Sequence, residues 1–187
     1  EQCKLIASLY ANRLPNAYGY DPMTDIQVLS PTRKGATGTT ALNVYLRQII
    51  NPIDHTKRET IFRGTIFREG DKVMQIRNNY DIIGEKPNGE AEEGVFNGDI
   101  GIIEEVDAKK EYIIVNYDDK KVTYTTETLE DLEPAYAVTV HKSQGSEFKA
   151  VILSLLEGAD ILFTRNLLYT AVTRARENLI IVGSAQR

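Results

Sequence analysis

The sequence predicts an α/β protein in which a parallel sheet is interrupted by a small β barrel. Residues 135–140 and 151–155 are continuous apolar runs, which are typical of strands buried on both faces of a parallel sheet. Residues 79–133 differ in texture, because they carry a net charge of −11 and several short strand-like runs. Residues 1–78 and 134–187 carry net charges of +4 and +2. The acidic middle therefore reads as a separate body placed within the sheet domain.

The first third of the chain predicts helix, strand and helix. Residues 2–14 have apolar residues at helical spacing, and Pro15 and Gly19 are expected to end that helix. Residues 26–29 read as a short buried strand that stops at the polar, basic loop 30–35. A second helix follows, with apolar residues spaced i, i+3, i+4, i+7 at Leu42, Tyr45, Leu46 and Ile49.

The middle third predicts short antiparallel strands. Asn97-Gly98 is a strong tight-turn signal, and residues 84–94, which hold three glycines, a proline and several acids, read as a mobile loop. A small barrel can be inserted into another domain because its ends lie close together. The expected strands are 99–106, 112–117 and 121–125. The expected domains are 1–68 and 133–187 for the sheet and 69–132 for the barrel.

The last third predicts a helix over residues 165–176 and a strand over 179–182. On such a helix Arg174 lies at one edge of an apolar stripe, so its stem packs while its guanidinium is held at a defined place. A fixed guanidinium is useful for meeting a phosphate. The alternative from spacing alone is a surface arginine whose stem lies along the core.

Composition excludes several classes of protein. The single cysteine, Cys3, allows no internal disulfide and suits a reducing compartment. His55 and His141 have no neighbours at metal-ligand spacing, so no metal site is expected. No apolar run is long enough to span a bilayer, and no signal peptide is visible, so a cytoplasmic protein is expected. The net charge of −5 argues against gripping nucleic acid by bulk charge.

Three motifs resemble those of superfamily 1 helicases. Residues 137–148, AVTVHKSQGSEF, resemble motif V in the form used by the RecD-like group, which includes the exodeoxyribonuclease V alpha subunit. Residues 168–176, LYTAVTRAR, resemble motif VI, and residues 28–35, VLSPTRKG, resemble motif IV. Residues 70–81 and 96–101 are similar to the SH3-like insert of the second motor domain. The resemblance implies a RecA-like sheet with helices on both faces, carrying an SH3-like barrel, as in the UvrD-like helicase C-terminal family.

The resemblance also implies roles in ATP hydrolysis. Arg174 would be the arginine finger that reaches the γ-phosphate, and Arg33 a second phosphate sensor. Glu147 would accept a hydrogen bond from the ATP ribose, although a carboxylate at a helix start is also favoured by the helix dipole. Gln144 and Gly145 would link the nucleotide side to the DNA side. Arg33, Arg174 and Glu147 are accordingly expected to converge on one rim.

For single-stranded DNA, the resemblance implies contacts from Thr139, His141 and Ser143. His141 could equally be a satisfied polar residue at a strand end. Asn78 and Asn79 of the insert are further candidates, although asparagine is also a common turn residue. The acidity of the insert argues against a phosphate clamp there, since such binding is driven by Lys and Arg.

No G-x-x-x-x-G-K-[ST] motif occurs in the sequence. ATP and Mg²⁺ are therefore expected to be bound mainly by an N-terminal RecA-like domain of the same protein, and this chain alone is expected to show no ATPase. The expected function is the C-terminal half of an ATP-dependent DNA helicase with 5′–3′ polarity, with nuclease-complex subunits as further possible partners. The alternatives are a non-catalytic adaptor whose barrel binds a protein tail, an RNA motor, or the helicase part of a relaxase.

Overall fold

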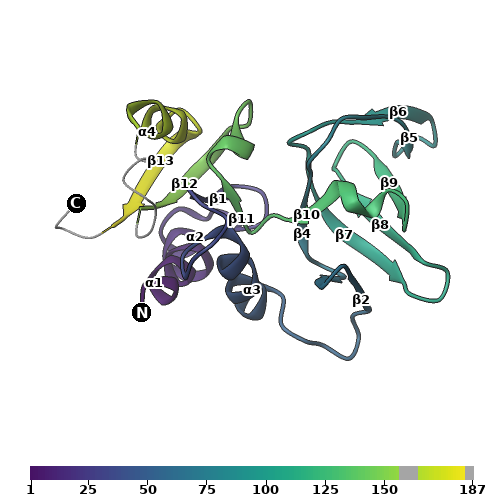
Figure 1. The fold of residues 1–187 in the computed structure, drawn as a ribbon, viewed down its shortest axis with the longest axis horizontal. Coiled ribbons are helices and arrows are strands. Elements are labelled where there is room, and N and C mark those ends of the chain that lie inside the picture. Colours follow the sequence, from purple (N-terminus) through teal and green to yellow (C-terminus); the bar gives the residue numbers. More distant parts are fainter. Residues whose placement is uncertain (156–163, 184–187) are drawn as a thin grey trace. The chain divides into compact units, whose positions relative to one another are not determined.

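The computed structural model describes residues 1–155 and 164–183 (Figure 1). The chain forms two compact units. Unit 1 comprises residues 1–52 and 136–187, and unit 2 comprises residues 53–135. Unit 2 is therefore inserted into the sequence of unit 1. The sequence predicted that the inserted domain comprises residues 69–132, and these boundaries stay a prediction.

Unit 1 is built on a four-stranded parallel sheet in the order β11-β1-β12-β13. Its central strand β1 (Ile26–Ser30) is buried along its whole length, as the apolar run predicts. The apolar runs around the inserted unit also form strands of this sheet, which confirms the predicted α/β class. The remaining strands are β11 (Ala137–Thr139), β12 (Phe148–Ser154) and β13 (Ala175–Val182).

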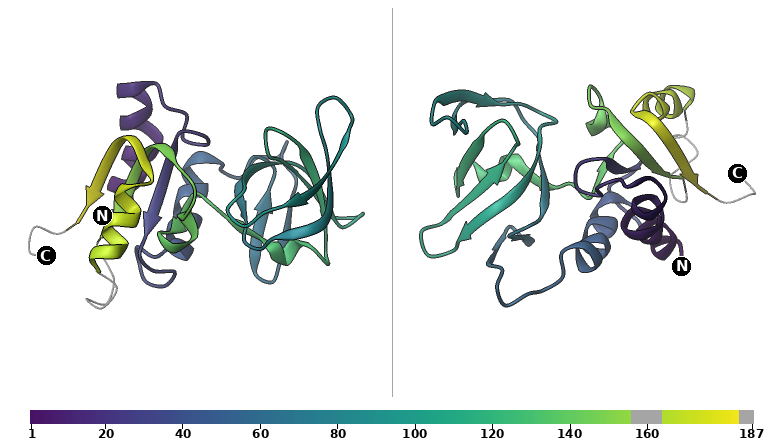
Figure 2. Two further views of the ribbon diagram at one scale, coloured as in Figure 1. Left: turned by 90° about the horizontal axis from the view of Figure 1, so that it is seen from above. Right: turned by 180° about the vertical axis from the view of Figure 1, so that it is seen from behind.

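Helices lie on both faces of this sheet, with α1, α2 and α3 on one face and α4 on the other (Figures 1 and 2). The first face holds the core, in which Ile6, Tyr10 and Leu46 pack with alternate residues of β1. The helices are α1 (Gln2–Ser8), α2 (Leu14–Tyr18), α3 (Thr39–Ile50) and α4 (Arg165–Val172).

The first helical segment continues past Pro15, where the sequence predicted that it would end. Proline has no N–H to donate, and the turn before it, η1 (Leu9–Arg13), is widened to a π-helix in which the Leu14 N–H bonds the Leu9 carbonyl. The segment stops at Gly19, whose φ of 72° gives the left-handed cap that glycine adopts without strain. Gly19 was correctly predicted as a terminator and Pro15 was not.

The predicted helix over 165–176 is too long at its end. The helix stops at Val172, and the Arg174 N–H bonds the Ala171 carbonyl in a tight turn. Ala175 already pairs with Phe148 at the start of β13, so sheet pairing overrides the helical spacing. Arg174 therefore sits in a turn between α4 and β13, and not on a helical stripe.

Unit 2 is an antiparallel, curled seven-stranded sheet with a β-hairpin beside it in sequence, as predicted for a small barrel (Figure 2). Its core is a single cluster that includes Val73, Ile103, Val115 and Tyr124. The sheet order is β10 (Leu132–Pro134), β4 (Lys72–Gln75), β7 (Ile100–Asp107), β8 (Tyr112–Asn116), β9 (Lys121–Thr125), β5 (Asn79–Glu85) and β6 (Ala91–Val95). The hairpin is β2 (Glu59–Phe62) and β3 (Thr65–Arg68), and a 3₁₀ turn, η2 (Leu129–Asp131), precedes β10.

The prediction of a mobile loop over residues 84–94 is wrong. Most of this segment belongs to β5 and β6, which pair with each other around a tight turn. In that turn the Lys86 N–H bonds the Glu90 carbonyl, and Gly89 takes a φ of 85°. Pro87 and Gly89 belong to the hairpin turn, whereas Gly84 and Gly94 lie on β5 and β6. Three of the four acids of this segment lie on the two strands, and Glu90 lies at the turn.

Candidate functional site

The strand register fixes two opposite edges of the unit 1 sheet. Ser30 of β1 lies beside Thr139 of β11, where both strands end. Phe148 lies beside Ala175, where β12 and β13 begin. Leu29, near the end of β1, pairs with Leu153 of β12. Phe148 lies five residues before Leu153 on β12, which is about 17 Å along that strand at about 3.3 Å per residue. Residues 140–147 therefore run from the carboxyl edge of the sheet to its amino edge.

The carboxyl edge carries the motif V residues Thr139 and His141. The Val140 N–H bonds the Ser30 carbonyl at 3.1 Å, which joins the ends of β11 and β1. Thr139 is half-buried and its Oγ1 accepts from the Lys142 N–H at 3.2 Å. His141 opens the short turn η3 (His141–Ser143) and is exposed. His141 is thus available to a ligand at this edge.

Ser143 is placed differently from what the sequence implied. It is fully buried, and its hydroxyl donates to the Val140 carbonyl at 2.6 Å. A hydroxyl that faces inward and is already bonded has a local structural role, because it closes the η3 turn. The geometry gives no support for a direct contact between Ser143 and a nucleic acid strand.

The loop after β1 brings Arg33 and Lys34 to the same carboxyl edge. The Thr39 and Thr40 N–H groups bond the Thr32 and Arg33 carbonyls at 3.0 and 3.1 Å, so the loop is folded back onto the start of α3. A Cβ on Gly38 would lie 2.3 Å from the Lys34 carbonyl oxygen, and only glycine fits this approach. Arg33 and Lys34 are exposed on this fixed loop.

The amino edge carries Glu147 and Arg174. The Phe148 N–H bonds the Arg174 carbonyl at 2.8 Å, and the Arg174 Nη1 donates to the Ser146 carbonyl at 3.0 Å. The guanidinium also donates to the Thr170 carbonyl and to Thr173 Oγ1, each at 3.2 Å. These three bonds use three of its five N–H donors and leave two. Arg174 is thus held beside Glu147, whose carboxylate is exposed.

The expectation that Arg33, Arg174 and Glu147 converge on one rim is wrong for Arg33. Glu147 and Arg174 share the amino edge, whereas Arg33 follows the carboxyl end of β1. The reason is the connection after β11, which carries motif V across the sheet to the amino end of β12. Gln144 and Gly145 occupy that connection and are both exposed, and Gly145 has a φ of 82°.

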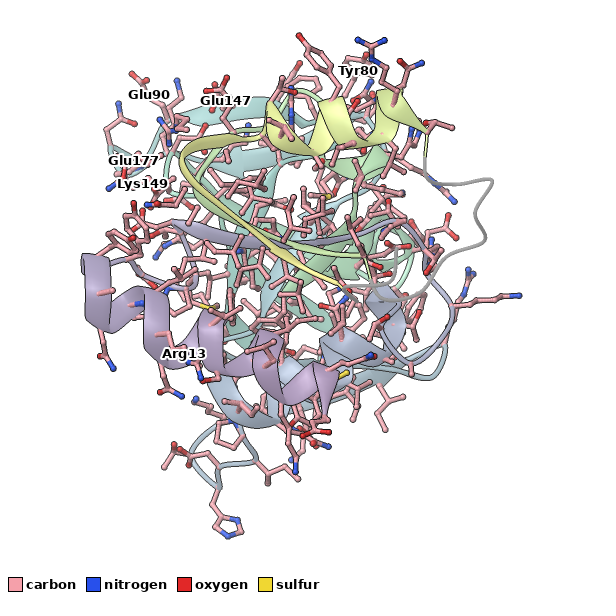
Figure 3. The ribbon with its side chains drawn as sticks, turned by 90° about the vertical axis from the view of Figure 1, so that its left-hand side faces the viewer. Arg13, Tyr80, Glu90, Glu147, Lys149 and Glu177 are labelled. Atoms are coloured by element: carbon pink, nitrogen blue, oxygen red, sulfur yellow. The ribbon has the colours of Figure 1, made fainter. Side chains whose placement is uncertain are left out.

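Further polar residues gather at the amino edge that sequence reasoning missed. Tyr20 donates its hydroxyl to Glu177 and accepts from Asn178 Nδ2 at 2.8 Å. The hydrogen bond to Glu177 raises the pKa of Tyr20. Glu147, Lys149 and Glu177 lie on the same side of unit 1 (Figure 3). Tyr20 and Glu177 are 157 residues apart in sequence, so no local pattern could have paired them.

In unit 2, Asn78 and Asn79 are both engaged in loop structure. The Asn79 Oδ1 accepts from the Asp81 and Ile82 N–H groups at 3.1 Å, and its Nδ2 donates to Asp131 at 3.3 Å. The Asn78 Oδ1 accepts from the Asn97 N–H at 2.9 Å. These bonds fit the turn-forming alternative, most fully for Asn79, while Asn78 remains exposed.

Two negative findings complete the description. Across residues 1–155 and 164–183, no group of three or more His, Cys, Asp and Glu side chains is arranged to hold a metal ion. In the same part of the chain, none of the helices combines the length and apolarity needed to cross a membrane.

Comparison with known proteins adds two family matches. Residues 42–117 match the family described as the SH3 domain of ATP-dependent RecD-like DNA helicases. Residues 134–182 match the UvrD-like helicase C-terminal domain. The first match begins within α3 of unit 1 and extends over most of the inserted unit, and the second falls on the half of unit 1 that follows the insertion.

Curated relatives point the same way. The ATP-dependent RecD2 DNA helicase of Deinococcus radiodurans is 38% identical over 160 residues, which cover 86% of this chain and 20% of the relative. The RecBCD enzyme subunit RecD of Mycobacterium tuberculosis is 38% identical over 90 residues, which cover 48% of this chain and 16% of the relative. The chain thus spans about a fifth or less of the length of these relatives.

Solved structures share the fold. A Pif1 helicase from Bacteroides in complex with ADP-AlF3 and single-stranded DNA superposes with a TM-score of 0.54 at 17% identity, covering 96% of this chain and 44% of that chain. The Pif1 helicase from Candida albicans gives a TM-score of 0.51 at 13% identity, covering 95% and 49%.

Proposed function

We propose that this chain, which belongs to the RecD-like helicases, supplies the second motor domain of an ATP-dependent DNA helicase. In the whole protein, ATP hydrolysis would drive movement along single-stranded DNA, with the 5′–3′ polarity that the resemblance implies. One observation carries the proposal: residues 140–147 connect the two edges of the sheet, with His141 at one end and Glu147 at the other. A single short segment can therefore connect a site for single-stranded DNA to a site for the nucleotide.

We assign the amino edge to the nucleotide. Arg174 has two N–H donors left after its three internal bonds, and a planar pair of donors suits a phosphate oxygen. Positive charge at this point would stabilise the negative charge that develops during phosphoryl transfer. The exposed Glu147 carboxylate can accept a hydrogen bond from a ribose hydroxyl. The Mg²⁺ that accompanies ATP would be held mainly by another domain of the whole protein.

We assign the carboxyl edge to single-stranded DNA. His141 is exposed there, and Thr139 is half-buried with its backbone paired to Ser30. Arg33 and Lys34 bring two positive charges to the same edge on a loop that is held by backbone hydrogen bonds. Their position supports contacts with the phosphates of single-stranded DNA. For Arg33, this role replaces the nucleotide contact that the sequence led us to expect. Backbone contacts of this kind position a strand without reading its sequence.

The test replaces Arg174 by alanine in the full-length protein. We expect ATP turnover to fall about 10³- to 10⁵-fold, as for loss of an arginine finger, while affinity for single-stranded DNA stays within a few-fold. Arg176→Ala is the matched control, because Arg176 is exposed on β13 two residues away. Near-normal turnover in Arg174→Ala would refute the finger assignment.

A structural role for Arg174 has to be separated from a catalytic one, because its side chain bonds the Ser146 carbonyl. Arg174→Lys keeps the charge and loses the planar fork. Because some of the three internal bonds are lost, we expect this variant to melt somewhat lower and to show strongly reduced turnover even at temperatures where it is fully folded. Turnover that recovers fully at temperatures where the variant is folded would indicate a structural role.

A further inference from the structure

Two aromatic rings are displayed together on the surface of unit 2. Tyr80 is 65% exposed and Phe96 is 42% exposed. Their ring centroids are 5.7 Å apart, with the planes inclined at 67°, so they form an edge-to-face pair. Figure 3 shows the Tyr80 ring projecting outward from the ribbon. Exposing two adjacent large apolar side chains is unfavourable in water and favours an interaction site at this position.

The backbone that carries the pair is tightly held. The Asn97 N–H bonds Asn78 Oδ1 at 2.9 Å, which joins the segment of Tyr80 to the segment of Phe96. The Phe96 N–H bonds Asp99 Oδ2 at 2.9 Å. The Phe96 ring also packs so closely on Gly94 that a Cβ there would lie 2.9 Å from it. The backbone segments that carry the two rings are therefore joined to each other, and the Phe96 ring is packed against Gly94.

A buried hydrogen-bond chain ties this surface to the core of unit 2. The hydroxyls of Tyr117 and Tyr124 are bonded to each other, and Tyr124 donates to Gln75 Oε1 at 2.7 Å. Gln75 Nε2 then donates to the Arg77 carbonyl at 2.9 Å, directly before Asn78. The Gln75 backbone bonds Gly98 and Asp99, each at 2.8 Å. One buried glutamine thus anchors both segments that carry the aromatic pair.

The chemistry around the rings favours a flat, partly polar ligand. The exposed Asn97 side chain makes no hydrogen bond within the described residues, so its amide can both donate and accept. Arg77, the nearest arginine in sequence, is paired with Glu130 at 3.4 Å and with Asp131 at 3.8 Å. The site therefore offers ring faces and an amide, and little uncompensated positive charge for a phosphate.

We propose that Tyr80 and Phe96 form a stacking platform for an unpaired base of single-stranded nucleic acid. The inference rests on the proposed function, and it gives the inserted unit a base contact of its own. Stacking on aromatic rings tolerates any base, because every base has a π-face. Such a platform can work on an acidic unit, since stacking does not depend on neutralising phosphates.

A protein partner is the competing occupant, and the size of the site argues against it. Stable protein interfaces bury about 800 Å² on each side, whereas the platform consists of two rings flanked by amides. A surface of two rings and a neighbouring amide is comparable in size to a single base.

The experiment uses tryptophan as a reporter, because the chain contains none. In Tyr80→Trp, the single indole keeps a ring at this position and its fluorescence is quenched when a base stacks on it. We expect titration with a thymidine oligonucleotide to quench the emission of this indole along the same isotherm as anisotropy of the labelled oligonucleotide. Tyr80→Ala should weaken binding about 5-fold to 150-fold, the range for loss of one stacked base.

Matched measurements separate the outcomes. Ile83→Ala truncates another apolar residue of β5, which is 60% exposed, and we expect unchanged affinity for the oligonucleotide. Tyr80→Ala should leave the slope of log K against log salt unchanged, because no phosphate contact is lost. If Tyr80→Trp bound the oligonucleotide without quenching and Tyr80→Ala kept full affinity, the platform would be overturned and the proposed function would stand. If the unaltered chain bound no oligonucleotide, both would fall.

Discussion

Replacing Arg33 and Lys34 together by alanine should weaken binding of single-stranded DNA most strongly at low salt. Both side chains are exposed on the loop that Thr39 and Thr40 hold in place at the carboxyl edge. For single strands each neutralised phosphate contributes about 0.7 to the slope of log K against log salt, so loss of two contacts flattens the slope by about 1.4. Between about 50 and about 200 mM salt, that difference amounts to about a sevenfold smaller loss of affinity in the variant.

The assay is fluorescence anisotropy with a labelled oligonucleotide at four or five salt concentrations, alongside ATP turnover of the full-length protein carrying the same changes. Arg176→Ala serves as the control for general loss of positive charge, because it lies on β13, which begins at the opposite edge. An unchanged salt slope with abolished ATP turnover would refute the reasoning. That result would return Arg33 to the nucleotide, in conflict with its place after the carboxyl end of β1.

Two further predictions concern unit 2. Tyr124→Phe leaves the buried Gln75 Oε1 without its 2.7 Å donor, so urea unfolding should show a free energy of unfolding lower by about 1–3 kcal/mol. Tyr112→Phe removes a half-buried hydrogen bond to Glu105 and should lower it by less. Equal losses in the two variants would contradict the importance of the buried hydrogen-bond chain. Burial opposes ionisation of Glu69, but hydrogen bonds from Arg58 and Val106 outweigh it and lower its pKa. The stabilisation is therefore present above the unfolded pKa of about 4.3 and lost as pH falls through the lower folded value, so unfolding at pH 5 and pH 3 should show a smaller acid loss in Glu69→Gln.

The elements that could be predicted from sequence are those whose signal is local. The run at 26–29 is apolar throughout and forms the buried central strand β1, and the strand predicted over 121–125 coincides with β9. The errors arose where pairing with a distant segment decided the outcome. Residues 84–94 form a hairpin because β5 pairs with β6 and with β9, and the helix before Arg174 stops because β13 pairs with β12.

The candidate site divides in the same way. Motif spacing identified the segments that hold Glu147 and Arg174, and the register brings them together at the amino edge. Motif spacing could not tell that Arg33 lies at the other edge, because that depends on which end of each strand a loop follows. It also could not tell that the Ser143 hydroxyl turns inward, or that Tyr80 and Phe96 meet on the surface, since these are contacts in three dimensions.

The short connection between the two edges has a thermodynamic consequence. Its turns are closed by local backbone hydrogen bonds, from the N–H groups of Ser143, Gln144 and Ser146 to the carbonyls of Val140, His141 and Ser143. The segment is therefore a compact spacer and not an extended flexible linker. If occupancy at one end shifts this spacer, the free energy of that shift is shared by both ligands. Bound nucleotide must then change the affinity for single-stranded DNA by the same factor by which bound DNA changes the affinity for nucleotide. Measuring both affinities therefore provides an internal check.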